Sequence, residues 1–197
     1  IKAGYAQARV TPVDRLSLDV GVRYEDATQQ VVPLGLDGLP SGSATATLPN
    51  NDYWLPAATL TWELTDSLQA RFNASKTIAR PQFRELILQT YYDPESNRQF
   101  TGNPGLIDSE LTNYEARVEY YWGSGSKFSL AGFYKDIENP IEVFSSFNDN
   151  TVVSRFANAP QAELYGAEVE VQWNKDLYSL GEWWDSKRFV AIANYTY

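Results

Sequence analysis

Apolar and polar residues alternate strictly along one stretch near the start of the chain. Within residues 16–25 every even position is apolar, from Leu16 to Tyr24, whereas the odd positions, from Ser17 to Glu25, are small or polar. Because successive side chains of a strand point to opposite faces, this stretch predicts a β-strand with one apolar and one polar face. The same alternation predicts about eight strands in all. They cover residues 2–10, 15–27, 53–63, 68–76, 111–122, 127–136, 163–173 and 188–197.

The connections between the predicted strands are alternately short and long. The short turns are expected at residues 11–14, 65–67 and 123–126, with a longer one at 174–187. The long connections are expected at residues 28–51, 80–110 and 138–160. Outer-membrane β-barrels have short periplasmic turns and long extracellular loops, so the pattern predicts a transmembrane β-barrel with the three long connections outside the cell.

A few local features qualify this pattern. Pro56 lies on an apolar face inside a strand and predicts a bulge or a break in the ladder, because proline lacks an N–H donor. Residues 83–88 can form a helical turn after Pro81, and residues 141–147 resemble a strand inside a long connection. Phe133 interrupts the alternation of its strand.

Two other architectures would satisfy the same alternation. In a soluble β-sandwich the apolar faces pack against a second sheet, and the protein could be a carbohydrate-binding module. Eight strands could also close alone as a small passive barrel. Strands near the ~9–11 residues that cross a bilayer favour the membrane interpretation. Aromatic residues near the strand ends favour it too, since such rings form belts at the two interfaces. They are Tyr24, Trp54, Trp62, Trp122, Phe128, Trp173 and Tyr195.

Composition narrows the function classes. The 197 residues are 43% hydrophobic and 14% aromatic, yet no apolar run approaches the ~20 residues of a membrane-spanning helix. Cys and His are absent, and no nucleophile–base arrangement is found, so we expect neither an enzyme nor a cofactor or metal site. A net charge of -9 disfavours nucleic acid as a partner. Because the chain starts at Ile1 within a predicted strand, we expect it to be a segment of a longer protein.

Several motifs resemble TonB-dependent outer-membrane receptors, in the order in which that family has them. They are FNASKTIARPQFREL at 72–86, TGNPGL at 101–106, LTNYE at 111–115, FYKDIENPI at 133–141 and AELYGAE at 162–168, together with the strand at 16–25. The resemblance covers nearly the whole chain. It implies an all-β, antiparallel transmembrane β-barrel segment, about eight strands of a roughly 22-stranded barrel.

The resemblance also implies partners and a function. Residues 1–197 would be part of one β-barrel domain in the C-terminal half of the receptor, without the N-terminal plug, the TonB-contacting segment and the closing strands. The whole protein would sit in the outer membrane, in contact with its lipid and its own plug. It would import a scarce nutrient, an oligosaccharide or a ferric siderophore, with energy supplied through the TonB complex. Arg80 and Pro81 match a family hallmark that we interpret as structural.

Two groups of residues are candidates for ligand contact. Aromatic rings in the second and third long connections could stack on sugars or on an aromatic siderophore, or could pack loop against loop. They are Tyr91, Tyr92, Phe100, Phe144 and Phe147. Arg71 and Arg117, with Glu63, Glu115 and Glu119, predict a charged lumen wall for ligand or plug contact, or generic cross-strand pairing. The oxygen-rich runs at 93–97 and 148–150 do not have the spacing of a calcium loop, and we interpret both as solvated.

Overall fold

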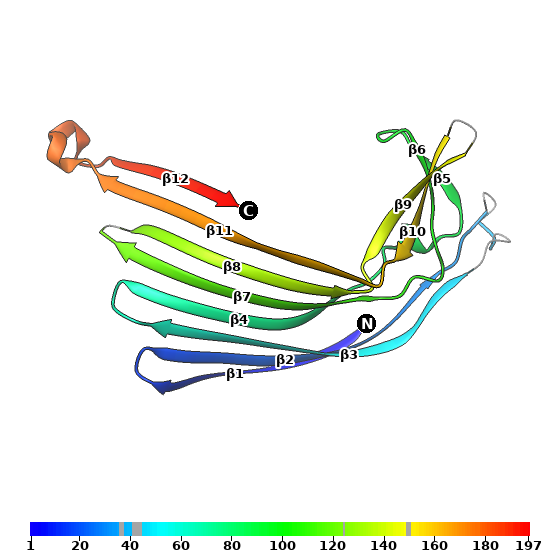
Figure 1. The fold of residues 1–197 in the computed structure, drawn as a ribbon, viewed down its shortest axis with the longest axis horizontal. Coiled ribbons are helices and arrows are strands. Elements are labelled where there is room, and N and C mark those ends of the chain that lie inside the picture. The colour runs from blue at the N-terminus through cyan, green and yellow to red at the C-terminus, as the bar shows by residue number, and fades with distance from the viewer. Residues whose placement is uncertain (36–37, 41–44, 124, 149–150) are drawn as a thin grey trace.

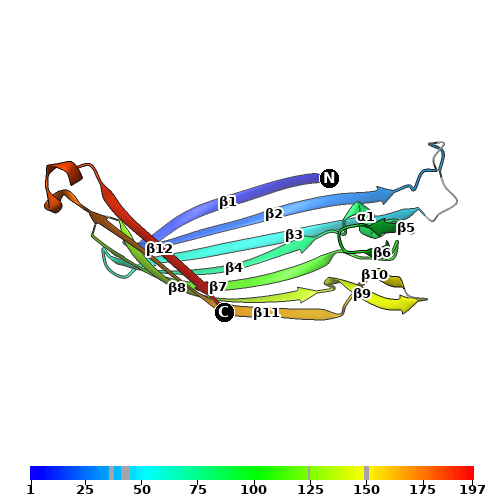
Figure 2. The ribbon, with the colours of Figure 1, turned by 90° about the horizontal axis from the view of Figure 1, so that it is seen from above.

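The computed structural model describes residues 1–35, 38–40, 45–123, 125–148 and 151–197. Eight long strands form one antiparallel sheet, here called the main sheet (Figure 1). In their order across the sheet they are β1 (Lys2–Val13), β2 (Leu16–Val31), β3 (Ala46–Glu63), β4 (Leu68–Ala79), β7 (Ser109–Trp122), β8 (Ser126–Glu138), β11 (Gln161–Asp176) and β12 (Arg188–Thr196). Since β1 and β12 are its two edges, the eight strands form an open curved sheet and do not close as a small barrel (Figure 2).

A second, smaller sheet stands at one end of the main sheet (Figure 1). It is formed by the second and third long connections, and its strand order is β5-β6-β10-β9. The elements are α1 (Phe83–Leu86), β5 (Thr90–Asp93), β6 (Arg98–Thr101), β9 (Ile141–Asn148) and β10 (Thr151–Asn158). We call these five elements the platform. The expected helical turn after Pro81 and the strand-like run at 141–147 are therefore confirmed as α1 and β9.

The strand register places the alternating apolar residues of the main sheet on one face. One row across the sheet contains Leu18, Leu60, Phe72, Ala116, Gly132 and Ala167, each paired with the next. Large side chains on this face, such as Trp54 and Tyr165, are exposed, and no second layer of the described residues covers them. The apolar face therefore does not belong to a β-sandwich core.

The expected strand limits hold within a few residues except next to the platform. The strands β2 and β3 continue to pair as far as Val31 and Ala46, beyond the predicted limits of 27 and 53. The reason is tertiary: both residues, with Leu48, are buried in the platform core. Residues 36–37 and 41–44 of the first long connection, which was expected at 28–51, lie outside the described residues.

Pro56 breaks the ladder on one side only. It pairs with Val22 of β2 without a register shift, whereas the pairing of β3 with β4 starts at Ala57. A proline can end a ladder in this way because it has no N–H to donate.

Phe133 interrupts the alternation because it lies opposite a glycine. It pairs with Gly166 on the polar face, and a Cβ added at that glycine would come within 2.8 Å of the Phe133 ring. The aromatic ring therefore fills the space that the glycine leaves.

The hydrophobic core lies between the platform and the adjoining ends of β2 and β3; we call it the platform core. Its buried members are Val31, Ala46, Leu48, Leu86, Leu106 and Phe156. Five separate parts of the chain contribute these residues: the end of β2, the start of β3, helix α1, the segment after β6, and β10. The core therefore joins the long connections to one another and to the end of the main sheet.

Candidate functional site

The platform places the five candidate rings in two different environments. The strand register puts Tyr92 and Phe144 on one face of the small sheet. Tyr91, Phe100 and Phe147 belong to the opposite face. The two faces differ in what they contact, so the five rings do not form one surface.

Two of the candidate rings are part of the platform interior. Tyr91 stacks on Phe100 with ring centroids 5.7 Å apart, and Phe100 stacks on Phe156 at 6.0 Å. Because Phe156 is buried and Phe100 packs against the core, this stack holds β5, β6 and β10 together. Burial also raises the pKa of the Tyr91 hydroxyl, which therefore stays protonated over the physiological pH range.

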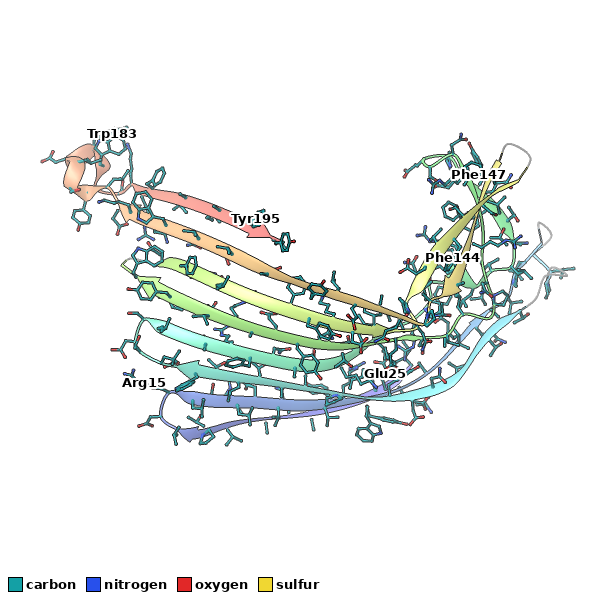
Figure 3. The ribbon with its side chains drawn as sticks, viewed as in Figure 1. Arg15, Glu25, Phe144, Phe147, Trp183 and Tyr195 are labelled. Carbon is teal, nitrogen blue, oxygen red and sulfur yellow. The ribbon has the colours of Figure 1, made fainter. Side chains whose placement is uncertain are left out.

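Three of the candidate rings are open to a ligand. Tyr92 and Phe144 are exposed on the outer face of the small sheet, and Phe147 is 88% exposed next to the β9–β10 turn. Figure 3 shows Phe144 and Phe147 on the platform, at the opposite end of the molecule from Trp183. Exposed aromatic faces can stack on a flat apolar or sugar ligand at low cost in side-chain entropy.

Arg71 and Arg117 lie elsewhere, on the polar face of the main sheet. They are directly opposite each other on β4 and β7. Arg71 forms an ion pair with Glu119 at 3.4 Å. Arg117 forms ion pairs with Glu115 at 3.0 Å and with Glu168 at 3.6 Å. The two like charges are tolerated because carboxylates surround them. They line a groove with Thr59, Asn73, Glu115 and Glu119, and none of the five rings lines it.

An ionic cluster with two buried carboxylates, Glu25 and Asp108, lies at the platform end of the main sheet, and it was not predicted from the sequence. Arg80, at the end of β4, forms an ion pair with Glu25 of β2, and its Nε lies 3.9 Å from Asp108, just before β7. Asp108 also accepts a hydrogen bond of 3.0 Å from the Tyr53 hydroxyl. Glu25 forms a second ion pair, of 2.8 Å, with Arg23. We call Glu25, Tyr53, Arg80 and Asp108 the junction cluster.

The Arg80–Pro81 pair was interpreted as structural, and both residues have specific contacts here. Arg80 forms the ion pairs described above, and the Pro81 carbonyl accepts a hydrogen bond of 2.8 Å from the side-chain amide of Gln29. Glu25 and Asp108 are each more than 25 residues from Arg80 along the chain, so no local pattern connects them. The sequence marks Glu25 only as the last residue of the strict alternation at 16–25, and Arg80 only as part of the family-like motif.

The segment 101–106 connects helix α1 to β10 through hydrogen bonds of Asn103. The Asn103 amide donates to the Glu85 carbonyl at 2.6 Å, and its side-chain amide donates to the Phe156 carbonyl at 3.1 Å. Gly102 fits against α1 so closely that a Cβ would lie 2.8 Å from the Glu85 oxygen. The motif at 101–106 therefore has a structural role, because it holds two elements of the platform together.

The described residues contain no cluster of three or more side chains suited to a metal ion. In the run at 93–97, Asp93 instead accepts a hydrogen bond of 2.6 Å from the Ser96 hydroxyl, which lowers the pKa of Asp93. Asp149 and Asn150 of the other oxygen-rich run lie outside the described residues. Of the described helices, none has the length and hydropathy to cross a membrane.

Solved structures of several receptors are similar to this chain in fold, among them the following three. The ferric enterobactin receptor of Pseudomonas aeruginosa, bound to enterobactin, aligns with a TM-score of 0.58 at 18% identity over 87% of this chain and 24% of that one. The hemophore receptor of Serratia marcescens, with its hemophore and heme, gives 0.62 at 14% identity over 86% and 31%. The siderophore receptor PirA of P. aeruginosa gives 0.61 at 16% identity over 86% and 30%. The chain thus spans less than a third of each receptor.

A family model described as "TonB dependent receptor-like, beta-barrel" matches residues 2–197. The match agrees with the long antiparallel strands, the uncovered apolar face and the short–long alternation of the connections. Proteins of this family reside in the outer membrane, which provides the apolar surroundings that this face requires. The chain therefore belongs to the TonB-dependent receptor family and forms part of its β-barrel.

Proposed function

We propose that this chain supplies part of the barrel wall and of the outer ligand-gathering surface of a receptor that takes up a scarce nutrient. The observation that carries the proposal is the contrast between the two ends of the strands. The apolar face of the main sheet is uncovered, whereas the long connections fold around a core of their own. A structured platform above a membrane-spanning wall is suited to collecting a ligand outside the cell.

The exposed rings of the platform are the proposed ligand contacts. Tyr92 and Phe144 share the outer face of the small sheet, and Phe147 is adjacent at its tip. The ligand classes are a ferric siderophore and an oligosaccharide, because both present flat surfaces on which rings stack. Two of the structures with a similar fold are described with enterobactin and with heme, which supports the iron-chelate class.

The charged groove on the polar face is proposed to face the lumen. There Arg71 and Arg117 would contact the plug domain or a ligand that passes it. Uptake would draw its energy from the TonB complex through that plug.

Binding to the purified full-length receptor tests this proposal. Ferric enterobactin and maltoheptaose serve as probes of the two classes, and titration calorimetry gives their dissociation constants. We expect one probe class to bind, and Phe144→Ala and Tyr92→Ala each to weaken it about tenfold, the equivalent of ~1.4 kcal/mol. Phe189→Ala, on the apolar face of β12, is the matched control and leaves binding unchanged.

Two results would contradict the proposal. If the probe that binds has the same dissociation constant for wild type and for the two platform variants, the rings are not the contact surface. If cells that lack TonB accumulate the bound probe as fast as cells that have it, the receptor is a passive channel.

A further inference from the structure

The connection between β11 and β12 is folded, and it lies at the end of the main sheet opposite to the platform (Figure 1). It contains two short 3-10 helices, η1 (Tyr178–Leu180) and η2 (Glu182–Trp184). The Leu177 amide donates to the Lys187 carbonyl at 3.0 Å and closes its base, and the Lys187 amide donates to the Trp184 carbonyl at 2.9 Å. We call residues 177–187 the foot. The turns at 14–15 and 64–67, at the same end, have no such helices.

The foot presents its large apolar side chains outward. Trp183 is 70% exposed, Tyr178 and Leu180 are also exposed, and neither helix contains a buried residue. The hydrogen bonds of the backbone, rather than a core, therefore hold the foot together. A cluster of exposed apolar side chains on a folded segment marks an interaction surface, because water disfavours it.

The surface combines aromatic rings with one positive charge, on Lys187, and two negative charges, on Glu182 and Asp185. Trp183 and Trp184 meet edge to face with centroids 4.6 Å apart. The Lys187 ammonium lies over the Trp183 ring, so the charge and the ring are presented together. Tryptophan prefers the headgroup level of a bilayer, and a lysine beside it can reach the lipid phosphates.

The foot continues a surface that already faces lipid. Trp173 of β11 and Phe189 of β12 flank it in the sequence, lie on the apolar face of the main sheet, and contact each other with centroids 5.7 Å apart. Other aromatic residues of this face, such as Tyr120, Trp122 and Phe128, occupy the same end of their strands. The foot is thus joined directly to the aromatic belt at the end with the short turns.

We propose that the foot docks on the phospholipid surface of the periplasmic leaflet of the outer membrane. Trp183 and Trp184 enter the headgroup layer, and Lys187 pairs with lipid phosphate. The foot would then act as an anchor that fixes the height of this part of the barrel in the bilayer. This inference requires the membrane position of the barrel but is independent of the nutrient that the receptor takes up.

Site-directed fluorescence tests the proposal in the full-length receptor, with any cysteine outside these residues replaced by serine. Residues 1–197 contain no cysteine, so S186C places a single environment-sensitive label on the foot without touching its rings. D14C, in the turn between β1 and β2, is the matched control at the same end. The receptor is reconstituted in vesicles of phosphatidylethanolamine and phosphatidylglycerol. Quenching is measured with doxyl-labelled lipid and with aqueous iodide.

We expect the label at S186C to emit at shorter wavelength than the label at D14C. Doxyl groups near the headgroups should quench it most strongly, at a depth of about 5–10 Å. In the S186C background, Trp183→Gln should lose most of the lipid quenching and become open to iodide. Because Trp183 is largely exposed, this variant should keep the folded, heat-modifiable mobility of the receptor.

Three outcomes would overturn the proposal. Iodide quenching at S186C equal to that at D14C would show that the foot lies in water. Shielding from both quenchers would show that a protein surface, such as the plug or a periplasmic partner, covers the foot. Lipid quenching that is unchanged by Trp183→Gln would show that the tryptophan does not hold the foot on the membrane.

Discussion

Phe72 and Leu86 are close in sequence but belong to regions that bury apolar surface in opposite ways. Phe72 leaves half of its surface (50%) open on the main sheet, whereas Leu86 is 0% exposed in the platform. The main sheet satisfies its backbone by strand pairing and leaves its apolar face to a lipid solvent. The platform, which we propose lies outside the membrane, excludes water with a core that it shares with the ends of β2 and β3.

The difference shows where each region obtains its stability. In the main sheet, the fold depends on the ladder and on a match between the apolar face and lipid. In the platform, it depends on a few buried residues and on backbone contacts such as those around Gly102. The junction cluster lies where the two regions meet, because Arg80 follows β4 and Asp108 precedes β7, at the two ends of the second long connection.

The largest effect is expected at the junction. Arg80→Gln leaves the buried carboxylates of Glu25 and Asp108 without their common partner, and breaking such a buried pair costs about 3–5 kcal/mol. The free energy of unfolding in guanidinium, measured on the full receptor in lipid vesicles, gives the cost. Arg9→Gln removes the exposed pair of Arg9 with Asp19 and should cost at most about 1 kcal/mol. Equal costs for the two variants would contradict the role of the junction.

A positive charge placed in each region tests whether lipid or water surrounds that region. Phe72→Arg should cost about 2–4 kcal/mol and lower the amount of folded receptor in the outer membrane, since lipid cannot solvate the guanidinium. Phe144→Arg is the matched change, because Phe144 has a similar exposed fraction of 54% but belongs to the platform. It should change stability by no more than about 0.5 kcal/mol. A tolerated Phe72→Arg would show that the apolar face does not contact lipid.

A methyl group added at a glycine should disturb the platform alone. In Gly102→Ala the new Cβ would approach the Glu85 oxygen and the Ile87 nitrogen to 2.8 Å, and such overpacking costs about 1–3 kcal/mol. Hydrogen exchange of the full receptor should show faster exchange in β5, β6 and β10, with no change in the main sheet. Gly132→Ala, in a strand paired on both sides, is the control: apart from its neighbours along the chain, no heavy atom lies closer than 3.9 Å to the added Cβ, so it should leave both regions intact. Faster exchange throughout the main sheet would mean that the two regions unfold together.

The sequence predicted the main sheet well because its signal is local. The alternation from Leu16 to Glu25, repeated in eight strands, determines which side chains share a face, and the register confirms it row by row. The strands β5 and β6 were not predicted because each has only four residues, and β10 was not predicted because it follows no two-residue period. The candidate rings were chosen by residue type alone. That choice could not separate the stacked Tyr91 and Phe100 from the exposed Tyr92 and Phe144.

The sequence by itself thus determined the strands of the main sheet, their two faces and the family, because a two-residue period and ordered motifs need no knowledge of distant contacts. Only the tertiary structure decided the platform core, the junction cluster and the shape of the foot. Val31, Leu86 and Phe156 meet from three separate parts of the chain, and Arg80 meets Glu25 across 55 residues. Such contacts arise when the chain closes its loops, and no pattern of neighbouring residues specifies them.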